Sequence, residues 1–478
     1  MISSSHLEIN HETSSIPPNK TPELSQSSIE EINNIRMYSS TSTCESDDSQ
    51  GWQRNKELCC LLVITEVFCV IFYSPWCLKY TDNTSEQIGL QYAMFQHVSC
   101  MMFLGFGLLM VCSARLGISS VVNTFIIGTV CIQYGMLFHH FWGSVLTATW
   151  KPIELELSDL IVGNFASATA LISFGAVIGH VTPAQMLIAT LVQIPLYSLN
   201  ESILAKQYTN SIQAVDMGGS MFVHTFGALS GIAMSIFLKR PICDSNINNK
   251  DAHDGIIPNS MTSYHSDIFS FIGTIVLWMF WPSFNGALAV GSGWYRVVLN
   301  TTIALSASCV SSVFMASVFS KDGQIVLEVI QNAALAGGVA VGSSSDLVIG
   351  PHIAIIIGVC AGAISSWGFL FGKEMVKERF KIDDVCGVLW LHGIPGIMGG
   401  LIGSLSAAVV NMNEYTNTNR DNHVQARYQL AALVVTIAMS LSTGYLMAFV
   451  ANTLTPLREY MSDKSTFVVA DDFPLKKE

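Results

Sequence analysis

A succession of apolar runs, each about twenty residues long, most constrains what this chain can fold into. The hydrocarbon core of a bilayer is about 30 Å thick, and a helix that crosses it needs roughly 20 apolar residues. Half of the 478 residues are hydrophobic and 12% are charged, whereas about 25% are charged in soluble domains. We therefore predict an all-α polytopic membrane protein with about twelve transmembrane helices. The expected spans are residues 58–78, 92–112, 119–141, 158–179, 184–205, 217–237, 267–288, 296–318, 324–343, 349–370, 385–408 and 428–452.

The expected spans divide the chain into three parts. Residues 1–56 are rich in Ser, Thr, Asn and Glu and contain few aromatic residues. Such a composition cannot bury enough apolar surface to fold alone, so we predict a disordered polar tail. Residues 57–455 would form the transmembrane domain, and residues 456–478 would form a short second tail.

The charges between the runs predict an orientation in the membrane. An even number of spans places both termini on one side, and that side then carries 17 of the 23 Lys and Arg residues. Because cytoplasmic loops carry an excess of basic residues, we predict that both termini are cytoplasmic. The same orientation puts the sequon Asn83-Thr84-Ser85 in the first outer loop, where Asn83 could be glycosylated.

Several classes of site find no support in the sequence. No stretch has the spacing of a metal centre, a phosphate loop or a nucleophile–base set, and no basic patch indicates nucleic-acid binding. We expect no cofactor, no metal, no enzymatic activity and no nucleic-acid partner. The cysteines form no CxxC pair, and we interpret those inside the apolar runs as small buried hydrophobes.

Two of the expected spans open with related sequences. "DMGGSMFVHTFGALSG", from Asp216 to Gly231, and "DVCGVLWLHGIPGIMG", from Asp384 to Gly399, share the pattern D-x-x-G-x4-H-x6-G. The pattern predicts an internal duplication, with two pseudo-symmetric halves around a central pore. Duplicated halves that place a site near the membrane midplane are common in transporters.

The spacing inside the repeat predicts a role for each ionisable residue. Eight residues rise about 12 Å along a helix, so Asp216 and Asp384 would cap helix starts while His224 and His392 would lie near mid-membrane. Glycines on the histidine faces would let the two helices approach closely. Desolvation favours neutral imidazole, and a neutral pair could share one hydrogen bond and serve a small polar solute. The alternative is that each histidine is structural and bonds to a backbone carbonyl.

Other polar and aromatic residues are less specific. Phe165 lies among small residues, and "WMFWPSFNGAL" places Trp281 and Phe284 around Pro282. These aromatic side chains could narrow a pore or simply pack. Glu201, near the outer end of a span, could attract cations or be solvated. We interpret the neighbouring residues His139 and His140 as solvated at the outer edge of the membrane.

The motifs together resemble the Rh branch of the ammonium transporter (Amt/Mep/Rh) family. "DMGGSMFVHTFGA", "FWPSFNGA", "IQNAALAGGVAVG", "LHGIPGIMGG" and "FQHVSCMMFLGFGLLM" are similar to Rh signatures, and they run in the family's order from about residue 57 to about residue 450. The resemblance implies an eleven- or twelve-helix bundle that assembles as homotrimers, with one pore per subunit and a glycosylated first outer loop.

The resemblance also implies residue roles. His224 and His392 match the twin pore histidines, Phe165 and Phe284 match the pore gate, and Asp216 matches the buried acidic residue, with Asp384 its counterpart in the repeat. Trp281 and Glu201 match residues of the outer vestibule. The sequence departs from the Rh pattern in its long Ser-rich tail and at Gly163-Asn164, where Rh proteins often carry a small residue and an acid.

The expected function follows from this resemblance. The chain would be a plasma-membrane channel in which ammonium loses a proton and ammonia crosses an apolar pore lined by the twin histidines, with methylammonium as a further expected substrate. Two alternatives stay open, a carbon dioxide channel and a non-conducting membrane scaffold. The lipid bilayer and two further copies of the chain are the expected partners.

Overall fold

The computed structural model describes residues 48–74, 78–80, 88–111, 116–205, 212–239, 262–320, 324–412, 415, 420–455 and 463. The chain forms two units, Met1–Gln53 and Arg54–Glu478, and the second contains nearly all of the described residues. The predicted disordered tail and the predicted glycosylation site Asn83 fall largely or wholly outside the described residues, as does most of the second tail. Those three expectations stay predictions.

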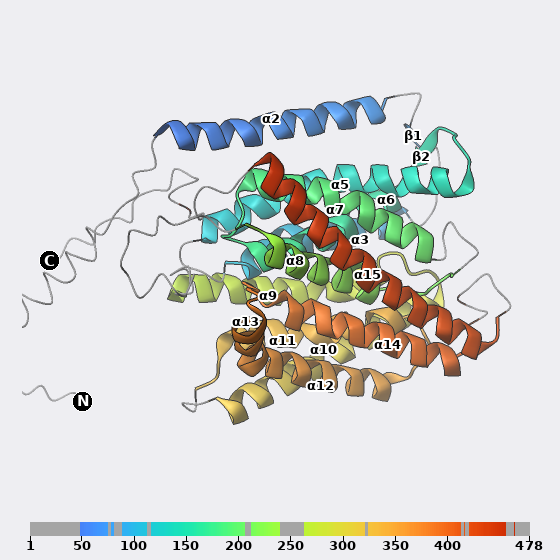
Figure 1. The fold of residues 1–478 in the computed structure, drawn as a ribbon. Coiled ribbons are helices and arrows are strands. Elements are labelled where there is room, and N and C mark those ends of the chain that lie inside the picture. The colour runs from blue at the N-terminus through green and yellow to red at the C-terminus, as the bar shows by residue number, and fades with distance from the viewer. Residues whose placement is uncertain are drawn as a thin grey trace, which may run out of the picture. The chain divides into compact units, whose positions relative to one another are not determined.

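Almost all described elements are helices (Figure 1). Among the described residues, two helices continue through a π-helical stretch, and two others begin with one. In chain order the elements are α2 (Asp48–Phe72), β1 (Leu78–Tyr80), α3 (Ile88–Cys100), π-helical η1 (Met101–Phe106), α4 (Gly107–Leu109), α5 (Gly117–Thr147), β2 (Ile153–Leu155), α6 (Leu157–Val177), α7 (Pro183–Leu204), π-helical η2 (Ser220–Thr225), α8 (Phe226–Phe237), α9 (Tyr264–Gly286), α10 (Ser292–Phe319), α11 (Leu327–Val341), the 3-10 turn η5 (Gly342–Ser344), α12 (Pro351–Trp367), π-helical η6 (Gly368–Gly372), α13 (Lys373–Phe380), π-helical η7 (Leu389–Gly393), α14 (Ile394–Val409) and α15 (Asn422–Leu454).

The helical membrane architecture predicted from the apolar runs is confirmed. Among the described residues, ten helical stretches are long and apolar enough to cross a membrane. The other two expected spans are also helical, but each differs for a physical reason. α11 has 15 residues, fewer than the roughly 20 that cross a bilayer. α2 carries Lys56 and Glu57 just before its apolar run and Glu66 within it.

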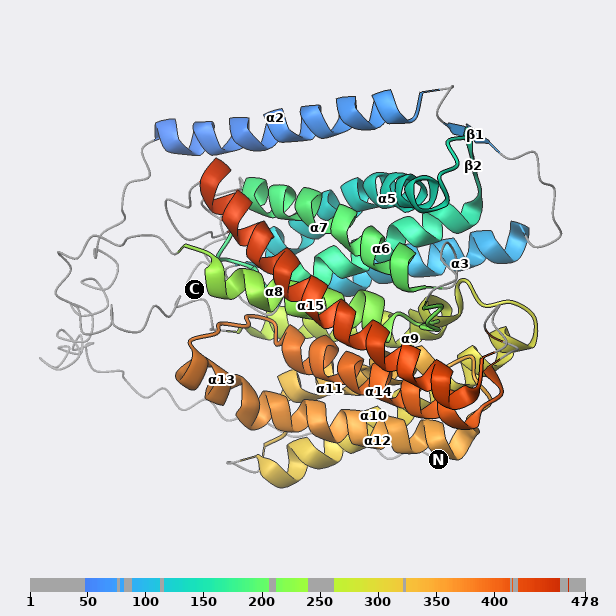
Figure 2. The same cartoon turned by 45° about the vertical axis from the view of Figure 1, so that its right-hand side comes forward.

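The most buried helices are α6 and α11. Nearly every residue of α6 from Ile161 onward is buried, as is nearly every residue of α11 from Val329 onward. α6 packs against α5 and α8, and α11 packs against α10, α12 and α14. Figures 1 and 2 both show α15 running obliquely across α7, α8 and α14, which agrees with its packing against these three helices.

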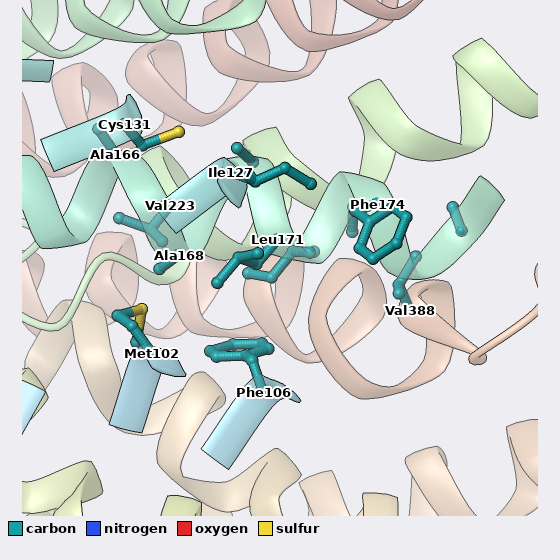
Figure 3. Close-up of a cluster of buried hydrophobic side chains, with 14 of the residues drawn as sticks. Met102, Phe106, Ile127, Cys131, Ala166, Ala168, Leu171, Phe174, Val223 and Val388 are labelled. Atoms are coloured by element: carbon teal, nitrogen blue, oxygen red, sulfur yellow. The ribbon is translucent and has the colours of Figure 1, made fainter. Parts of the chain in front are cut away.

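The main hydrophobic core lies between α3, η1, α5, α6 and the two repeated segments. Figure 3 shows Met102 and Phe106 projecting from η1 toward Ala168 and Leu171 of α6. Val223 of η2 and Val388, just before η7, belong to the same cluster. The core therefore joins both halves of the repeat through α6.

A short parallel ladder relates α2 to α5. β1 and β2 pair with Leu78 opposite Ile153 and Tyr80 opposite Leu155. Because β1 follows α2 and β2 follows α5, the C-terminal ends of both helices lie on the same side of the membrane. α2 also contacts α5 directly, because the Gln133 amide donates to Glu66 Oε1 at 3.1 Å. The hydroxyl of Tyr73, which directly follows α2, donates to the carbonyl of Gln133 at 2.7 Å.

Candidate functional site

The two repeated segments begin with the same backbone turn. Gly219 and Gly387 have φ angles of +67° and +72°, a left-handed conformation that glycine adopts without steric cost. Each glycine carbonyl accepts hydrogen bonds from the start of the following π-helical segment, including the amide of His224 at 2.9 Å in the first repeat. The shared spacing of Asp and Gly in the two repeats thus gives the same backbone turn in each of them.

The two aspartates cap these segments, as the spacing predicted. Asp216 Oδ2 accepts hydrogen bonds from the amides of Met221 (2.9 Å) and Phe222 (2.8 Å). The Asp384 carboxylate accepts from the amides of Val388 and Leu389, both at 2.9 Å. Each carboxylate therefore satisfies two amides that the helix start would leave without an intrahelical partner.

Burial changes the acidity of both caps, which lie just before the membrane-spanning segments. Loss of hydration raises the pKa of Asp216 to about 6, and it raises the pKa of Asp384 to about 6. The Ser343 hydroxyl and the backbone amides oppose the rise at Asp216. At Asp384 the opposing influences are the amide of Leu389, the charge of Lys373 and the amide of Val388.

The π-helical segments bring the two histidines together. The Nδ1 atoms of His224 and His392 are 3.1 Å apart, with ring centroids at 5.1 Å and ring planes inclined by 7°. The two residues are 0% and 2% exposed. One Nδ1 must carry the hydrogen and the other must accept it, because a nitrogen pair at this distance is a hydrogen bond with one donor. The predicted contact between the two repeats is therefore present.

The second nitrogen of His224, Nε2, is one of several buried polar atoms that have no hydrogen-bond partner among the described residues. A buried polar atom without a partner costs about 1–3 kcal/mol, and a small polar molecule beside His224 Nε2 would remove that cost. The backbone-carbonyl alternative considered from the sequence does not describe this imidazole.

Aromatic rings surround the histidine pair. Trp281 stacks on His224 (centroids 5.5 Å apart, planes at 19°) and lies 6.4 Å from His392. Phe106, on η1, stacks on His392 at 5.9 Å. Trp281 is 0% exposed, so the structure places it against the imidazoles rather than at an open mouth.

Phe165 and Phe284 contact each other edge to face, with centroids 4.7 Å apart and planes at 60°. Phe284 is in turn 5.7 Å from His224. The side chains therefore form a continuous series in the order Phe165, Phe284, His224, His392 and Phe106. Four of these five were candidates from the sequence, and Phe106 was not. Phe106 lies within the segment FQHVSCMMFLGFGLLM, and nothing in the local pattern indicates which helix its ring faces.

We predicted that glycines on the histidine faces let the two repeats approach closely, and this holds for the second repeat but not for the first. Side chains at Gly396 or Gly399 would collide with Ser220 of η2, so these glycines do allow the two repeats to approach. Gly227 and Gly231 instead face α6, where a side chain would meet Thr169, Ile172 or Ser173. The helical spacing correctly identified the faces that carry small residues, but it could not identify which helix packs against each face.

Glu201 lies in a cluster that the sequence reading missed. Its side chain is mostly buried, and its Oε2 is 4.0 Å from Nδ1 of His139. His140 Nε2 is 2.8 Å from Asp159 Oδ1. The expectation that both histidines are solvated at the outer edge is wrong, because His139 is 5% exposed and each imidazole faces a carboxylate on a neighbouring helix. The signal available in the sequence was four ionisable residues near the same end of three successive spans.

Comparison with known proteins agrees with this architecture. The model of the Ammonium Transporter Family matches residues 59–466. Ammonium transporter Rh type C-like 2 of Danio rerio is 37% identical over 384 residues, which cover 77% of this chain and 75% of the relative. Ammonium transporter Rh type B of Oryctolagus cuniculus is 38% identical over 381 residues, which cover 76% and 79%.

Solved structures show the same fold. Nitrosomonas europaea Rh50, described as one of the Rhesus protein family of channels, superposes with a TM-score of 0.67 at 29% identity, covering 82% of this chain and 94% of that one. Saccharomyces cerevisiae Mep2 superposes with a TM-score of 0.62 at 18% identity, covering 79% and 88%. The family match, the Rh relatives and the shared helical architecture agree. This chain therefore belongs to the ammonium transporter family and to its Rh type.

Proposed function

We propose that this protein is a membrane channel for ammonia and ammonium, and that neutral ammonia is the species that crosses its apolar centre. The family and the Rh relatives support transport of ammonium. The single observation that carries the finer proposal is the buried pair of His224 and His392, with Nδ1 atoms 3.1 Å apart.

The energetic argument concerns charge. An ion near the bilayer centre costs several kcal/mol, and the series from Phe165 to Phe106 offers no carboxylate in contact with the rings described. Ammonium would therefore lose a proton before or at the Phe165–Phe284 contact. A neutral molecule then needs only to replace the hydrogen bonds that it made to water.

The histidine pair can supply such a replacement. If His224 Nδ1 donates to His392, His224 Nε2 is an acceptor; with the opposite tautomers it is a donor. Ammonia both donates and accepts, so it fits either state. Two protonated imidazoles would present two donors to each other at Nδ1, and the observed contact therefore favours the neutral pair.

Phe165 and Phe284 form the gate in this proposal, and rotation of either ring would open the contact between them. Trp281 forms a wall beside the imidazoles. Glu201 and Asp216 would favour cations on the outer side. Assembly as a homotrimer in the plasma membrane, with a glycosylated Asn83, completes the proposal and rests on the resemblance to Rh proteins. The cytoplasmic position of both termini rests on the excess of basic residues on that side.

The test is flux into liposomes with simultaneous recording of current. We compare the wild type with His224→Ala and His392→Ala, and use His265→Ala, an exposed histidine on α9, as the matched control. Loss of a buried hydrogen-bond partner costs about 1–3 kcal/mol, so we expect ammonia flux to fall about fivefold to a hundredfold in the first two variants, with no change in the control.

The outcomes separate the parts of the proposal. Wild-type flux equal to that of protein-free liposomes would rule out conduction and favour a scaffold. Carbon dioxide flux without ammonia flux would establish the alternative channel. Unchanged ammonia flux in both variants would remove only the role of the histidine pair, and a current proportional to flux would show that the transported species is charged.

A further inference from the structure

Glu66 is an acidic residue in the middle of an apolar helix. The apolar residues of α2 start at Leu58 and continue to Phe72. Glu66 follows Leu58 by eight residues, which rise about 12 Å along a helix, and the hydrocarbon core is about 30 Å thick. The carboxylate of Glu66 therefore lies well inside the hydrocarbon, and the proposed conduction gives it no role.

One face of α2 packs against α5 and holds this carboxylate at the edge of the contact. Cys69 is buried, and the ring of Phe68 lies 5.7 Å from the ring of Tyr134. Glu66 Oε1 accepts a hydrogen bond from the side-chain amide of Gln133 at 3.1 Å. Among the described residues this is the only hydrogen bond of the Glu66 side chain, so Oε2 has no donor there.

The Glu66 side chain is exposed and borders an apolar face of the same helix. Ile64, Val67 and Ile71 are 64%, 53% and 60% exposed, with the spacing of three and four residues at which paired helices contact each other. Their β-branched side chains have few rotamers to lose on packing. Figures 1 and 2 show α2 at the edge of the bundle, with other helices on one side of it only. This face is thus built to pack against a further helix.

The charge of Glu66 decides what can cover this face. Lipid tails offer no donor to Oε2, and an ionised side chain in the hydrocarbon is costly unless it is paired. If the same face of a second copy of the chain met it, two Glu66 carboxylates would approach and repel each other. A Lys or Arg side chain at this depth supplies both a donor and the opposite charge.

We propose that the exposed face of α2 binds a transmembrane helix of another membrane protein, and that this helix carries a Lys or Arg at the depth of Glu66. The basic side chain donates to Glu66 Oε2, while Gln133 keeps its bond to Oε1. Ile64, Val67 and Ile71 pack against the partner's apolar residues. Apolar contact alone gives little advantage over lipid in a bilayer, so the charge pair selects the partner and its depth. The proposal does not depend on the proposed conduction.

The test uses synthetic transmembrane helices of Leu and Ala as the probe. Three of them carry Lys, Leu or Glu at the midpoint, and a fourth carries Lys seven residues away, which keeps the helix face but moves the charge by about 10 Å. The full-length protein, with the photo-cross-linking residue p-benzoylphenylalanine in place of Val67, is reconstituted into liposomes with each helix. The yield of covalent adduct is measured after irradiation. The same cross-linker in place of Val310 of α10, which is 72% exposed, gives the background from random encounters.

We expect the helix with Lys at its midpoint to give about fivefold to thirtyfold more adduct at Val67 than the other three, because this is the strength of a polar contact between membrane helices. The four yields should be equal at Val310. Glu66→Gln keeps the size of the side chain and an oxygen for Gln133, and it should remove the preference for Lys. Glu57→Gln, on the same helix but before its apolar run, is the matched control and should retain the preference.

Equal yields from the midpoint Lys and Leu helices at Val67 would overturn the proposal, and so would a preference for Lys that persists in Glu66→Gln. An adduct between two copies of the protein through Val67, without any preference for Lys, would assign the face to self-association and overturn it as well. If Glu66→Gln is poorly folded by size-exclusion chromatography, the comparison of the four helices still decides, because it needs no change at Glu66.

Discussion

The segments Asp216–Gly231 and Asp384–Gly399 share a cap, a left-handed glycine, a π-helical segment and a buried histidine, yet they differ in what surrounds these parts. Asp216 also accepts a hydrogen bond from the hydroxyl of Ser343, and Ser220 bonds to the backbone of α11 and η5. The first repeat is therefore joined to its neighbours by uncharged groups.

The second repeat is joined by charged groups. Lys373 donates to the carbonyl of Val385 at 3.1 Å and pairs with Glu328 at 2.8 Å. Asp383 lies 3.5 Å from His180 and 3.7 Å from Lys377. The comparison teaches that duplication preserved the parts that place the histidines, while the surroundings of the two copies diverged.

Removing the two aspartate caps should give the largest difference in stability between the repeats. Asp216→Ala leaves two amides and the Ser343 hydroxyl without their acceptor, whereas Asp384→Ala leaves two amides. At about 1–3 kcal/mol per buried group, we expect a loss of about 3 kcal/mol or more for the first variant and about 2 kcal/mol for the second. Thermal unfolding in detergent measures both.

The control for the caps is Asp421→Ala, which removes an exposed cap from the start of α15. It should cost about 1 kcal/mol. A greater loss in Asp384→Ala than in Asp216→Ala would contradict the view that the Ser343 hydroxyl strengthens the first cap.

The pH dependence of stability tests the burial of the same caps. Both carboxyls have a pKa of about 6 in the folded protein, against 3.8 for an aspartate in water. Between about pH 4 and pH 6 the folded state therefore binds more protons than the unfolded state, so stability rises as pH falls through this window. One pKa unit corresponds to about 1.4 kcal/mol, so a rise of about two units gives an expected contribution of about 3 kcal/mol from each cap.

Asp216→Asn and Asp384→Asn remove this contribution while retaining an oxygen that can accept a hydrogen bond. Unfolding temperatures measured from pH 4 to pH 7 should show the wild type gaining stability relative to each variant as pH is lowered. A constant difference between wild type and variant across the range would show that burial does not perturb that carboxyl.

A smaller effect is expected from the glycines. Gly219→Ala and Gly387→Ala each force a left-handed alanine, which costs about 1–2 kcal/mol. The added methyl group would meet Val223 of the same segment in the first case and the ring of Phe369 in the second. We therefore expect Gly387→Ala to lower the unfolding temperature more.

Gly219 and Gly387 occupy the same place in their repeats and both have a left-handed φ, so the backbone cost is common to the two variants. Equal losses in the two variants would show that the contact with Phe369 adds nothing beyond the contact with Val223.

The smallest expected difference between the repeats is in how their stability depends on salt concentration. Glu328→Gln removes a partly exposed ion pair of the second repeat, for which we expect about 0.2–1 kcal/mol at low ionic strength and less at about 1 M salt. Ser343→Ala removes an uncharged contact of the first repeat, so its effect on unfolding should be the same at both salt concentrations. Equal salt dependence of the two variants would remove the proposed difference between the repeats.

The sequence by itself determined the membrane class, the approximate spans, the repeat and the candidate side chains. These features depend on local properties: a run of apolar residues fills one bilayer thickness, and the Asp-x-x-Gly pattern gives the same cap in both repeats. Asp216, Asp384, His224 and His392 could all be named before any coordinate was considered.

The tertiary structure decided which side chains meet. His224 and His392 are 168 residues apart, Phe106 reaches His392 from a third segment, and His139 faces Glu201 across two helices. Gly227 faces α6 rather than the other repeat. Such contacts depend on how all the helices pack and on π-helical segments that shift the register of a helix face, and neither is contained in the periodicity of one span.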